Sequence, residues 1–217
     1  MMELVETGSS AAAPFTEGAD VVALDTETTG LWWGSRLVEL AAVRLRGAVV
    51  VGRWSVRVHP EGPIPARVTA LHGLGEAEVA SCAPASAVLG DFRRFVSGAV
   101  LVAHNAAFDR DILAAEYVRA GLAAPDDPLV CSLALARRLV PESPRFGLHR
   151  LGAHLGLPTG VAHRALDDAT LTLGLWQSLR ARMAAAGLGL DAALATTEGA
   201  GPVRIAGAVR RLAPRAL

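Results

Sequence analysis

The hydrophobic positions divide the chain into short apolar runs first and longer periodic segments later. Residues 21–26 form an apolar run that ends in polar residues, which is typical of a buried β-strand. Two longer strand-like segments, 37–46 and 49–58, flank Gly47, and every second residue from Trp54 is apolar. This pattern predicts a hairpin whose second strand turns its alternate side chains, Trp54, Val56 and Val58, toward the core.

The rest of the chain alternates helical periodicity with single strands. Apolar runs at 99–103 and 129–132 predict two further buried strands. Helical spacing predicts helices over 66–71, 85–96, 108–120, 148–155 and 166–186. Three strands followed by this alternation indicate an α/β domain, with a mixed sheet flanked by helices.

The two ends of the chain lack such periodicity. Residues 1–19 are rich in Ala, Ser, Gly and Glu and are interpreted as a flexible leader. Residues 20–186 carry the predicted domain. Residues 187–217 form a Gly-, Ala- and Arg-rich tail, which is either flexible or docks a partner.

Composition narrows the class of protein. The 217 residues are 52% hydrophobic and 19% charged, which excludes global disorder. The 21 cationic residues, all arginine, balance 21 acidic ones, so a strongly basic nucleic-acid coat is excluded. The first residues do not resemble a signal peptide, no apolar run is long enough to span a membrane, and the two cysteines match no metal spacing. We therefore expect a cytoplasmic protein with no membrane partner and reduced thiols.

The first candidate for chemistry is a pair of acids at the end of the first predicted strand. Asp25 and Glu27 are two residues apart, so their side chains point to the same face. Two unpaired carboxylates this close repel each other, and a divalent cation would compensate them. For an isolated pair, a loop cap at Asp25 and an arginine partner for Glu27 would be the commoner explanation.

The second candidate follows the strand predicted at 99–103. His104, Asn105, Phe108 and Asp109 lie between this strand and the next helix. Asn105 is the only asparagine of the chain and suits a helix N-cap, while an acid such as Asp109 is favoured in a first helical turn. Taken alone, this segment is therefore weak evidence of function.

The third candidate opens the last long helix. His163 and Asp168 can serve one site only if His163 precedes the helix, whereas an earlier helix start would pair His163 with Asp167. Spacing leaves the two aspartates in competition, and we expect the other one to be a solvated charge. His149 and His154 match no metal motif and are interpreted as ordinary surface or core histidines.

The three segments are more informative together. Acids and a histidine at strand ends and helix starts, in the order D-x-E, D and H-x4-D, are what two-metal phosphodiester hydrolysis requires. Magnesium prefers carboxylate and water oxygens, and a histidine can accept the proton of the attacking water.

The same segments resemble the DEDDh family of 3′-to-5′ exonucleases, the group that contains the proofreading subunit of bacterial DNA polymerase III. The resemblance spans Val21–Gln177 and rests on five segments in family order. These are DTETTGL (25–31), RLVELAAV (36–43), ALHGL (70–74), LVAHNAAFDRDIL (101–113) and HRALDDA (163–169).

The resemblance implies a ribonuclease-H-like fold with a five-stranded mixed sheet, and it makes residues 20–186 an exonuclease domain. It favours Asp168 over Asp167 and implies two divalent cations, Mg²⁺ or Mn²⁺. Asp25, Glu27, Asp109 and Asp168 would be the metal ligands, with His163 as general base. The substrate-binding residues would be Thr28, Thr29, Gly30, Leu31, His72, His104, Asn105 and Phe108.

The expected activity is hydrolysis of the 3′-terminal phosphodiester, mainly of single-stranded DNA, to nucleoside 5′-monophosphates in proofreading or repair. Within the same family the substrate could be RNA or short oligonucleotides. From a different class, the chain could be a polymerase-binding adaptor that uses its C-terminal tail. The intact acidic set argues against an adaptor role alone, although a nuclease that docks on a DNA polymerase through the tail combines both.

Overall fold

The computed structural model describes residues 18–31, 34–189, 191, 193 and 203–212. Its centre is a mixed sheet in the strand order β3-β2-β1-β4-β5-β6. β1, β4 and β5 are parallel to one another, whereas β2, β3 and β6 each run antiparallel to a neighbour. The strands are β1 (Val21–Thr28), β2 (Leu37–Arg46), β3 (Val49–Arg57), β4 (Val100–Ala103), β5 (Pro128–Cys131) and β6 (Val203–Arg204).

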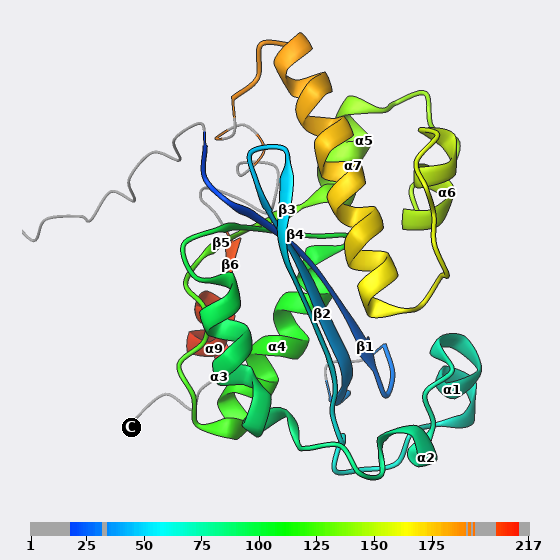
Figure 1. Cartoon of the computed structure of the whole chain (residues 1–217), viewed down its shortest axis with the longest axis vertical. Helices are drawn as coiled ribbons and strands as arrows, with labels where there is room; N and C mark the ends of the chain where they lie inside the picture. Colours follow the sequence, from blue (N-terminus) through cyan, green and yellow to red (C-terminus); the bar gives the residue numbers. More distant parts are fainter. Residues whose placement is uncertain (1–17, 32–33, 190, 192, 194–202, 213–217) are drawn as a thin grey trace, which may run out of the picture.

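Helices cover both faces of this sheet (Figure 1). One face carries α3, α4 and α9, and the other carries α5, α6 and α7, while α1 and α2 lie beyond one end of β1 and β2. The helices are α1 (Ala66–His72), α2 (Glu76–Val79), α3 (Ala85–Val96), α4 (Ala106–Ala120), α5 (Ser132–Leu139), α6 (Leu148–His154), α7 (Ala165–Ala185) and α9 (Ile205–Leu212).

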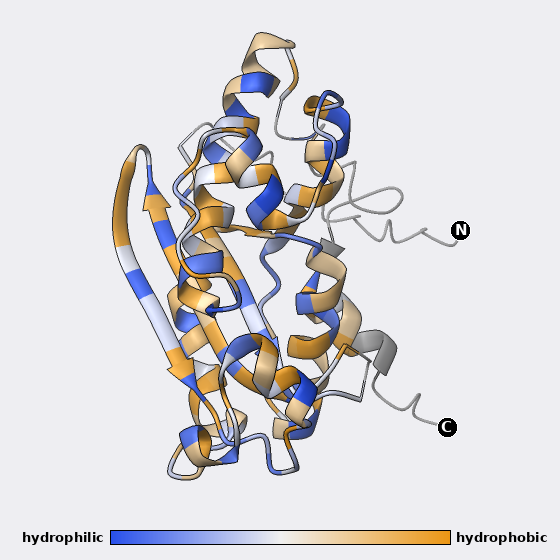
Figure 2. Ribbon diagram, turned by 90° about the vertical axis from the view of Figure 1, so that its right-hand side faces the viewer, coloured by the Kyte–Doolittle hydropathy of each residue, from blue (hydrophilic) through white to orange (hydrophobic). Residues whose placement is uncertain are grey.

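The side-chain alternation of the strands builds two separate cores. On β1, Val22 and Leu24 pack toward α3 and α4, whereas Val21 and Ala23 pack toward α7. Because β1 is buried on both faces, it reads as a continuous apolar run rather than an alternating one. In Figure 2 the central strands are largely hydrophobic, and the hydrophilic segments are mostly in loops and on outer turns of helices.

The predicted mixed sheet flanked by helices is confirmed, including the hairpin turn at Gly47, whose φ of 60° suits glycine. On β3, Trp54 and Val56 are half-buried and contact the core, as the alternation predicts. Three helices, α2, α5 and α9, were not predicted. α2 has only four residues, and α5 follows β5 without a break at Ser132, so no loop residues mark its start.

Part of the predicted tail belongs to this architecture. β6 pairs with β5, and α9 packs on α4 through the buried Ile205 and Ala208. β6 therefore adds a sixth strand to the five that were expected. The leader predicted at 1–19 lies almost entirely outside the described residues, and the docking role of residues 187–217 stays a prediction.

The parallel strands bring distant segments to one edge. The carboxyl ends of β1 and β4 adjoin because β1 pairs in parallel with β4. The start of α7 also lies against β1 and β2. Ligands of open α/β sheets bind at the carboxyl ends of parallel strands, so this edge is the place to look for a site.

Candidate active site

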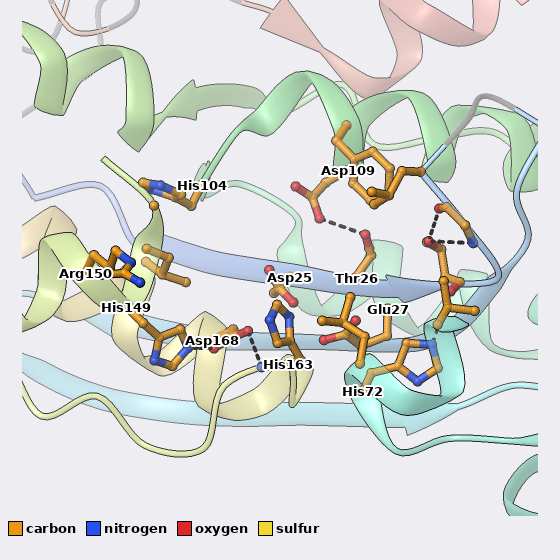
Figure 3. Close-up of a pocket in the computed structure, with 18 residues that line it drawn as sticks. Asp25, Thr26, Glu27, His72, His104, Asp109, His149, Arg150, His163 and Asp168 are labelled. Atoms are coloured by element: carbon orange, nitrogen blue, oxygen red, sulfur yellow. Dashed lines mark hydrogen bonds and ion pairs between the residues drawn. The ribbon is translucent and has the colours of Figure 1, made fainter. Parts of the chain in front are cut away.

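An open pocket of about 390 Å³ lies at this edge and brings the three predicted segments together. Figure 3 shows His104, His149 and Arg150 at one end of it and His72 at the other, with the carboxylates between them. The lining residues are Asp25, Thr26, Glu27, Thr28, Gly30, Leu31, Val68, Leu71, His72, His104, Phe108, Asp109, Gly147, Leu148, His149, Arg150, His163 and Asp168.

The end of β1 supplies two acids from the face that meets α7. Asp25 and Glu27 continue the row begun by Val21 and Ala23, so the alternation that buries valine and alanine also aims both carboxylates into the pocket. Burial, and then the charges of Asp109, Asp168 and Glu27, raise the pKa of Asp25 well above its usual range. Burial together with neighbouring acids raises the pKa of Glu27 to about 8.

Asp109 reaches the pocket from the opposite face of β1. The Thr26 side chain, which points toward α4, donates a hydrogen bond of 2.8 Å from Oγ1 to Oδ1 of Asp109. Burial raises the pKa of Asp109 to about 7, against the lowering effect of that hydrogen bond. Asn105 precedes α4 in the left-handed conformation, φ 67°, which asparagine tolerates, and its side chain makes no capping hydrogen bond. Asn105 does not line the pocket.

The start of α7 separates the two competing aspartates. α7 begins at Ala165, so His163 precedes the helix, and its left-handed backbone, φ 60°, lies at the turn into it. Asp168 lines the pocket and accepts the His163 backbone N–H at 3.0 Å through Oδ2. Asp167 points elsewhere and accepts the Val161 N–H at 3.1 Å. It is half-buried, so it is a turn-stabilising acid rather than the solvated charge that was expected.

Glu27, His163 and Asp168 can hold a metal ion between them, since one ligand atom from each lies within 4.8 Å of the others. The donor set suits a hard divalent cation, because two further carboxylates, Asp25 and Asp109, line the same pocket and none of the four pocket acids forms an ion pair with a described arginine. The raised pKa values of Glu27 and Asp109 mean that these carboxylates are destabilised in their charged form. A bound cation would stabilise that charged form. Of the acids predicted to bind metal, Glu27 and Asp168 therefore fit a cation site, and Asp25 and Asp109 line the same pocket.

The predicted substrate-binding residues divide between two ends of the pocket. Thr28 contacts His72 at one end, and Gly30, Leu31 and Phe108 also line the pocket; Leu31 is 76% exposed and His72 is buried. His72 Nε2 lies 3.2 Å from the Thr28 carbonyl, and burial lowers its pKa. Thr29 does not line the pocket; its Oγ1 accepts the Arg36 N–H at 2.9 Å and closes the turn between β1 and β2.

His104 lies at the other end and is held on both ring nitrogens. Nε2 lies 2.8 Å from the Phe146 carbonyl and Nδ1 lies 3.0 Å from the Ser132 hydroxyl. A carbonyl only accepts, so Nε2 carries a hydrogen, while Nδ1 faces the Ser132 hydroxyl. Burial lowers the pKa of His104 to about 4, so the ring is neutral at pH 7. This residue ties the loop before α6 to the end of β4.

His149 and Glu39 are among the residues of this region that the sequence prediction missed. His149 was interpreted as an ordinary histidine, yet its Nε2 lies 2.5 Å from Oδ1 of Asp168. Glu39 on β2 pairs with Glu27 across the strands, and its Oε2 accepts the N–H of Ala165, the first residue of α7, at 3.1 Å. The alternation of β2 could have placed Glu39 on the Glu27 face, but no local signal points to His149.

The comparisons with known proteins agree with this geometry. A family model described as exonuclease (RNase T) matches residues 22–176. The chain belongs to this exonuclease family. The matched range contains β1 through most of α7, and thus every acid of the pocket.

Two curated exonuclease-family relatives are similar over about three quarters of the chain. An epsilon-like protein of DNA polymerase III from Rhodobacter capsulatus is 40% identical over 172 residues, which cover 74% of this chain and 24% of that protein. A putative bifunctional exonuclease/endonuclease of Mycobacterium tuberculosis is 33% identical over 171 residues, covering 75% of this chain and 26% of that protein. The chain thus matches only about a quarter of the length of these relatives.

Solved structures of exonucleases share the fold. Exonuclease X in complex with 5′-overhanging duplex DNA is 30% identical, with a TM-score of 0.65, covering 82% of this chain and 99% of that one. Exonuclease I of E. coli in complex with a dT13 oligonucleotide has a TM-score of 0.69 at 17% identity, covering 78% of this chain and 42% of that one. The predicted ribonuclease-H-like architecture is confirmed by these neighbours. Within the described residues, no helix is both long and apolar enough to cross a membrane.

Proposed function

We propose that this chain is a metal-dependent 3′-to-5′ exonuclease of the DEDDh type, which hydrolyses the 3′-terminal phosphodiester of mainly single-stranded DNA and releases nucleoside 5′-monophosphates. The observation that carries the proposal is the convergence of Asp25, Glu27, Asp109, Asp168 and His163 on one pocket. The four acids come from one face of β1 and from the helices α4 and α7, and salt bridges to described arginines neutralise none of them.

Asp25, Glu27, Asp109 and Asp168 would hold two divalent cations, Mg²⁺ or Mn²⁺. Such ions supply positive charge that favours attack of water on the phosphate and stabilises the leaving oxygen. His163 is exposed beside Asp168, and its imidazole accepts the proton of the attacking water. The left-handed turn at His163 sets the direction of this ring at the mouth of the pocket.

The two ends of the pocket suit two parts of a nucleic-acid end. Leu31, Leu71 and Phe108 offer apolar surface beside His72, which suits a terminal nucleoside. At the other end Arg150 is exposed and forms no ion pair with any described acid, so its guanidinium is available to a phosphate. Structures of exonucleases X and I with DNA support DNA as substrate, and they bear the same fold.

The context of the activity is replication proofreading or DNA repair. The similarity to an epsilon-like protein of DNA polymerase III supports a polymerase partner. The lack of net charge adds a physical argument, because a protein that neutralises few phosphates binds nucleic acid weakly. Such a nuclease binds only a short 3′ end by itself. A partner protein, contacted by residues 187–217, would keep it on the DNA.

The test is degradation of single-stranded oligonucleotides labelled at the 3′ or the 5′ end. We expect a divalent cation to permit early release of the 3′ label as a mononucleotide, while the 5′ label stays on shortening strands. A chelator should stop both. Early release of the 5′ label, or cleavage unaffected by the chelator, would contradict the proposal. Matched RNA strands in the same assay decide whether the substrate is RNA instead.

A further inference from the structure

Both carboxylate oxygens of Asp168 are engaged within the protein. Oδ1 lies 2.5 Å from Nε2 of His149, and Oδ2 accepts the backbone N–H of His163 at 3.0 Å. The Asp168 side chain is 8% exposed and that of His149 is 27% exposed, so little water competes for these contacts. Two hydrogen bonds, one to each oxygen, fix the plane of the carboxylate, while each oxygen keeps a second lone pair.

His149 reaches Asp168 because α6 packs against α7. A Cβ added to Gly152 of α6 would lie 2.8 Å from Cδ1 of Leu171 on α7, which is closer than carbon atoms tolerate. Leu151 is fully buried beside this contact, so α6 is held against α7 by packing. On its other side, the segment before α6 is tied to His104 through the Phe146 carbonyl. The position of His149 is therefore set by two independent anchors.

We propose that His149 is a positioning residue, which holds the Asp168 carboxylate in the orientation that receives a divalent cation beside Glu27 and His163. The inference rests on the proposed function, since His149 contacts a ligand of the proposed metal site and not the metal itself. Partners of metal ligands commonly change metal affinity about 10–100-fold when they are removed. His149 takes no part in proton transfer in this account and acts through Asp168 alone.

The experiment compares His149→Asn and His149→Gln with His154→Asn. The asparagine side chain is too short to reach Asp168 as Nε2 does, whereas the glutamine amide can place a donor near that position. His154 lies on the same helix and is exposed, so its replacement is the matched control. Binding of Mn²⁺ is measured by calorimetry without nucleic acid, and kcat and KM are measured on a single-stranded oligonucleotide.

We expect His149→Asn to weaken Mn²⁺ binding about 10–100-fold and to lower kcat at fixed metal, with the KM for DNA within about twofold of the parent. His149→Gln should restore much of both losses, and His154→Asn should change neither.

Several results would overturn the inference. Unchanged Mn²⁺ affinity in His149→Asn would show that Asp168 needs no orientation, and tighter binding would show that His149 competes with the cation. A higher KM with unchanged kcat would make His149 a DNA contact instead. If the parent protein binds Mn²⁺ but leaves DNA intact, the proposed function is wrong. The Mn²⁺ affinities of the parent and of His149→Asn still test whether His149 positions Asp168.

Discussion

The two ends of β1 carry acids of the same chemistry in opposite electrostatic settings. Asp20, just before the strand, accepts hydrogen bonds from Arg44 at 2.7 Å and from Arg46 at 2.8 Å. These hydrogen bonds, the one from Arg46 first, lower the pKa of Asp20 to about 2. Glu27, at the other end of the strand, has acids for neighbours, and its pKa rises to about 8.

The contrast separates an acid that is paired with arginines from acids whose charged neighbours are mainly other acids. Around Asp20 the sequence provides its own cations, on the neighbouring strand β2, and the ion pairs hold the strand ends together. At the carboxyl end of β1 the chain gathers Asp25, Glu27, Asp109 and Asp168 without such partners. A fold that leaves buried acids uncompensated gives up stability there, which is expected where a bound cation completes the site.

The largest expected effect is that of Asp25→Asn. This variant loses a central carboxylate and should lower the rate of 3′-nucleotide release roughly a thousandfold, because several kcal/mol of electrostatic stabilisation depend on the cations. The metal-free variant should unfold at a higher temperature than the parent, since a buried acid crowded by other acids is removed. Calorimetric melting and a nuclease assay measure both. Full activity in Asp25→Asn would refute the site.

The next largest effect distinguishes the neighbouring aspartates of α7. Asp168→Asn should lower kcat roughly a hundredfold, because Asp168 lines the pocket beside Glu27 and His163. Asp167→Asn should leave kcat within a few-fold, because Asp167 bonds the Val161 N–H outside the pocket. Steady-state kinetics on one oligonucleotide rank the two variants. The opposite ranking would mean that the start of α7 is misassigned.

Asp20→Asn should affect stability and spare activity. Losing the charge that accepts from Arg44 and Arg46 should lower the free energy of unfolding by about 1–3 kcal/mol at pH 7. Because the pKa of Asp20 is lowered to about 2, its contribution is present above about pH 4 and is lost as the pH falls toward 2. Denaturant titrations across this range measure the loss in the parent and its absence in the variant. A large drop in kcat of the folded variant would contradict the claim that Asp20 contributes to stability alone.

At Glu27 we expect a pH dependence of the opposite sign. Its pKa of about 8 means that the native state keeps a proton between pH 4.5 and 8 that the unfolded chain has released. In chelator, the stability should therefore fall as the pH rises through this window, by at most about 1.4 kcal/mol per pH unit for one proton. Glu27→Gln should flatten this fall, which urea titrations at several pH values detect. An equally steep fall in the variant would contradict the assignment.

The sequence predicts that Asp25, Glu27, Asp109 and Asp168 come together, because their positions follow local rules. Strand alternation places Asp25 and Glu27 on one face, and β1 and β4 end at one edge because they are parallel. The choice of Asp168 over Asp167 needed the family resemblance, and the structure shows why, since α7 starts only at Ala165. The helix α5 was not predicted because it begins directly after β5, with no turn residues between them.

The residues that sequence reasoning missed depend on contacts between distant segments. His149 meets Asp168 across 19 residues, and Glu39 meets Ala165 across 126. The arginines that neutralise Asp20 lie 24 and 26 residues further along the chain, so no local pattern separates Asp20 from Asp25. Electrostatic partners of this kind become visible only when the sheet register and helix packing are known.

The most direct test of the account is calorimetric binding of Mn²⁺ to the parent protein, to Asp20→Asn and to the double variant Asp25→Asn/Glu27→Gln. The account predicts that the parent and Asp20→Asn bind Mn²⁺ with similar affinity, because the arginine-paired acid takes no part in the cation site. The double variant should show no binding at concentrations that saturate the parent. Equal Mn²⁺ binding by a folded double variant would contradict the claim that the uncompensated acids of β1 form the metal site.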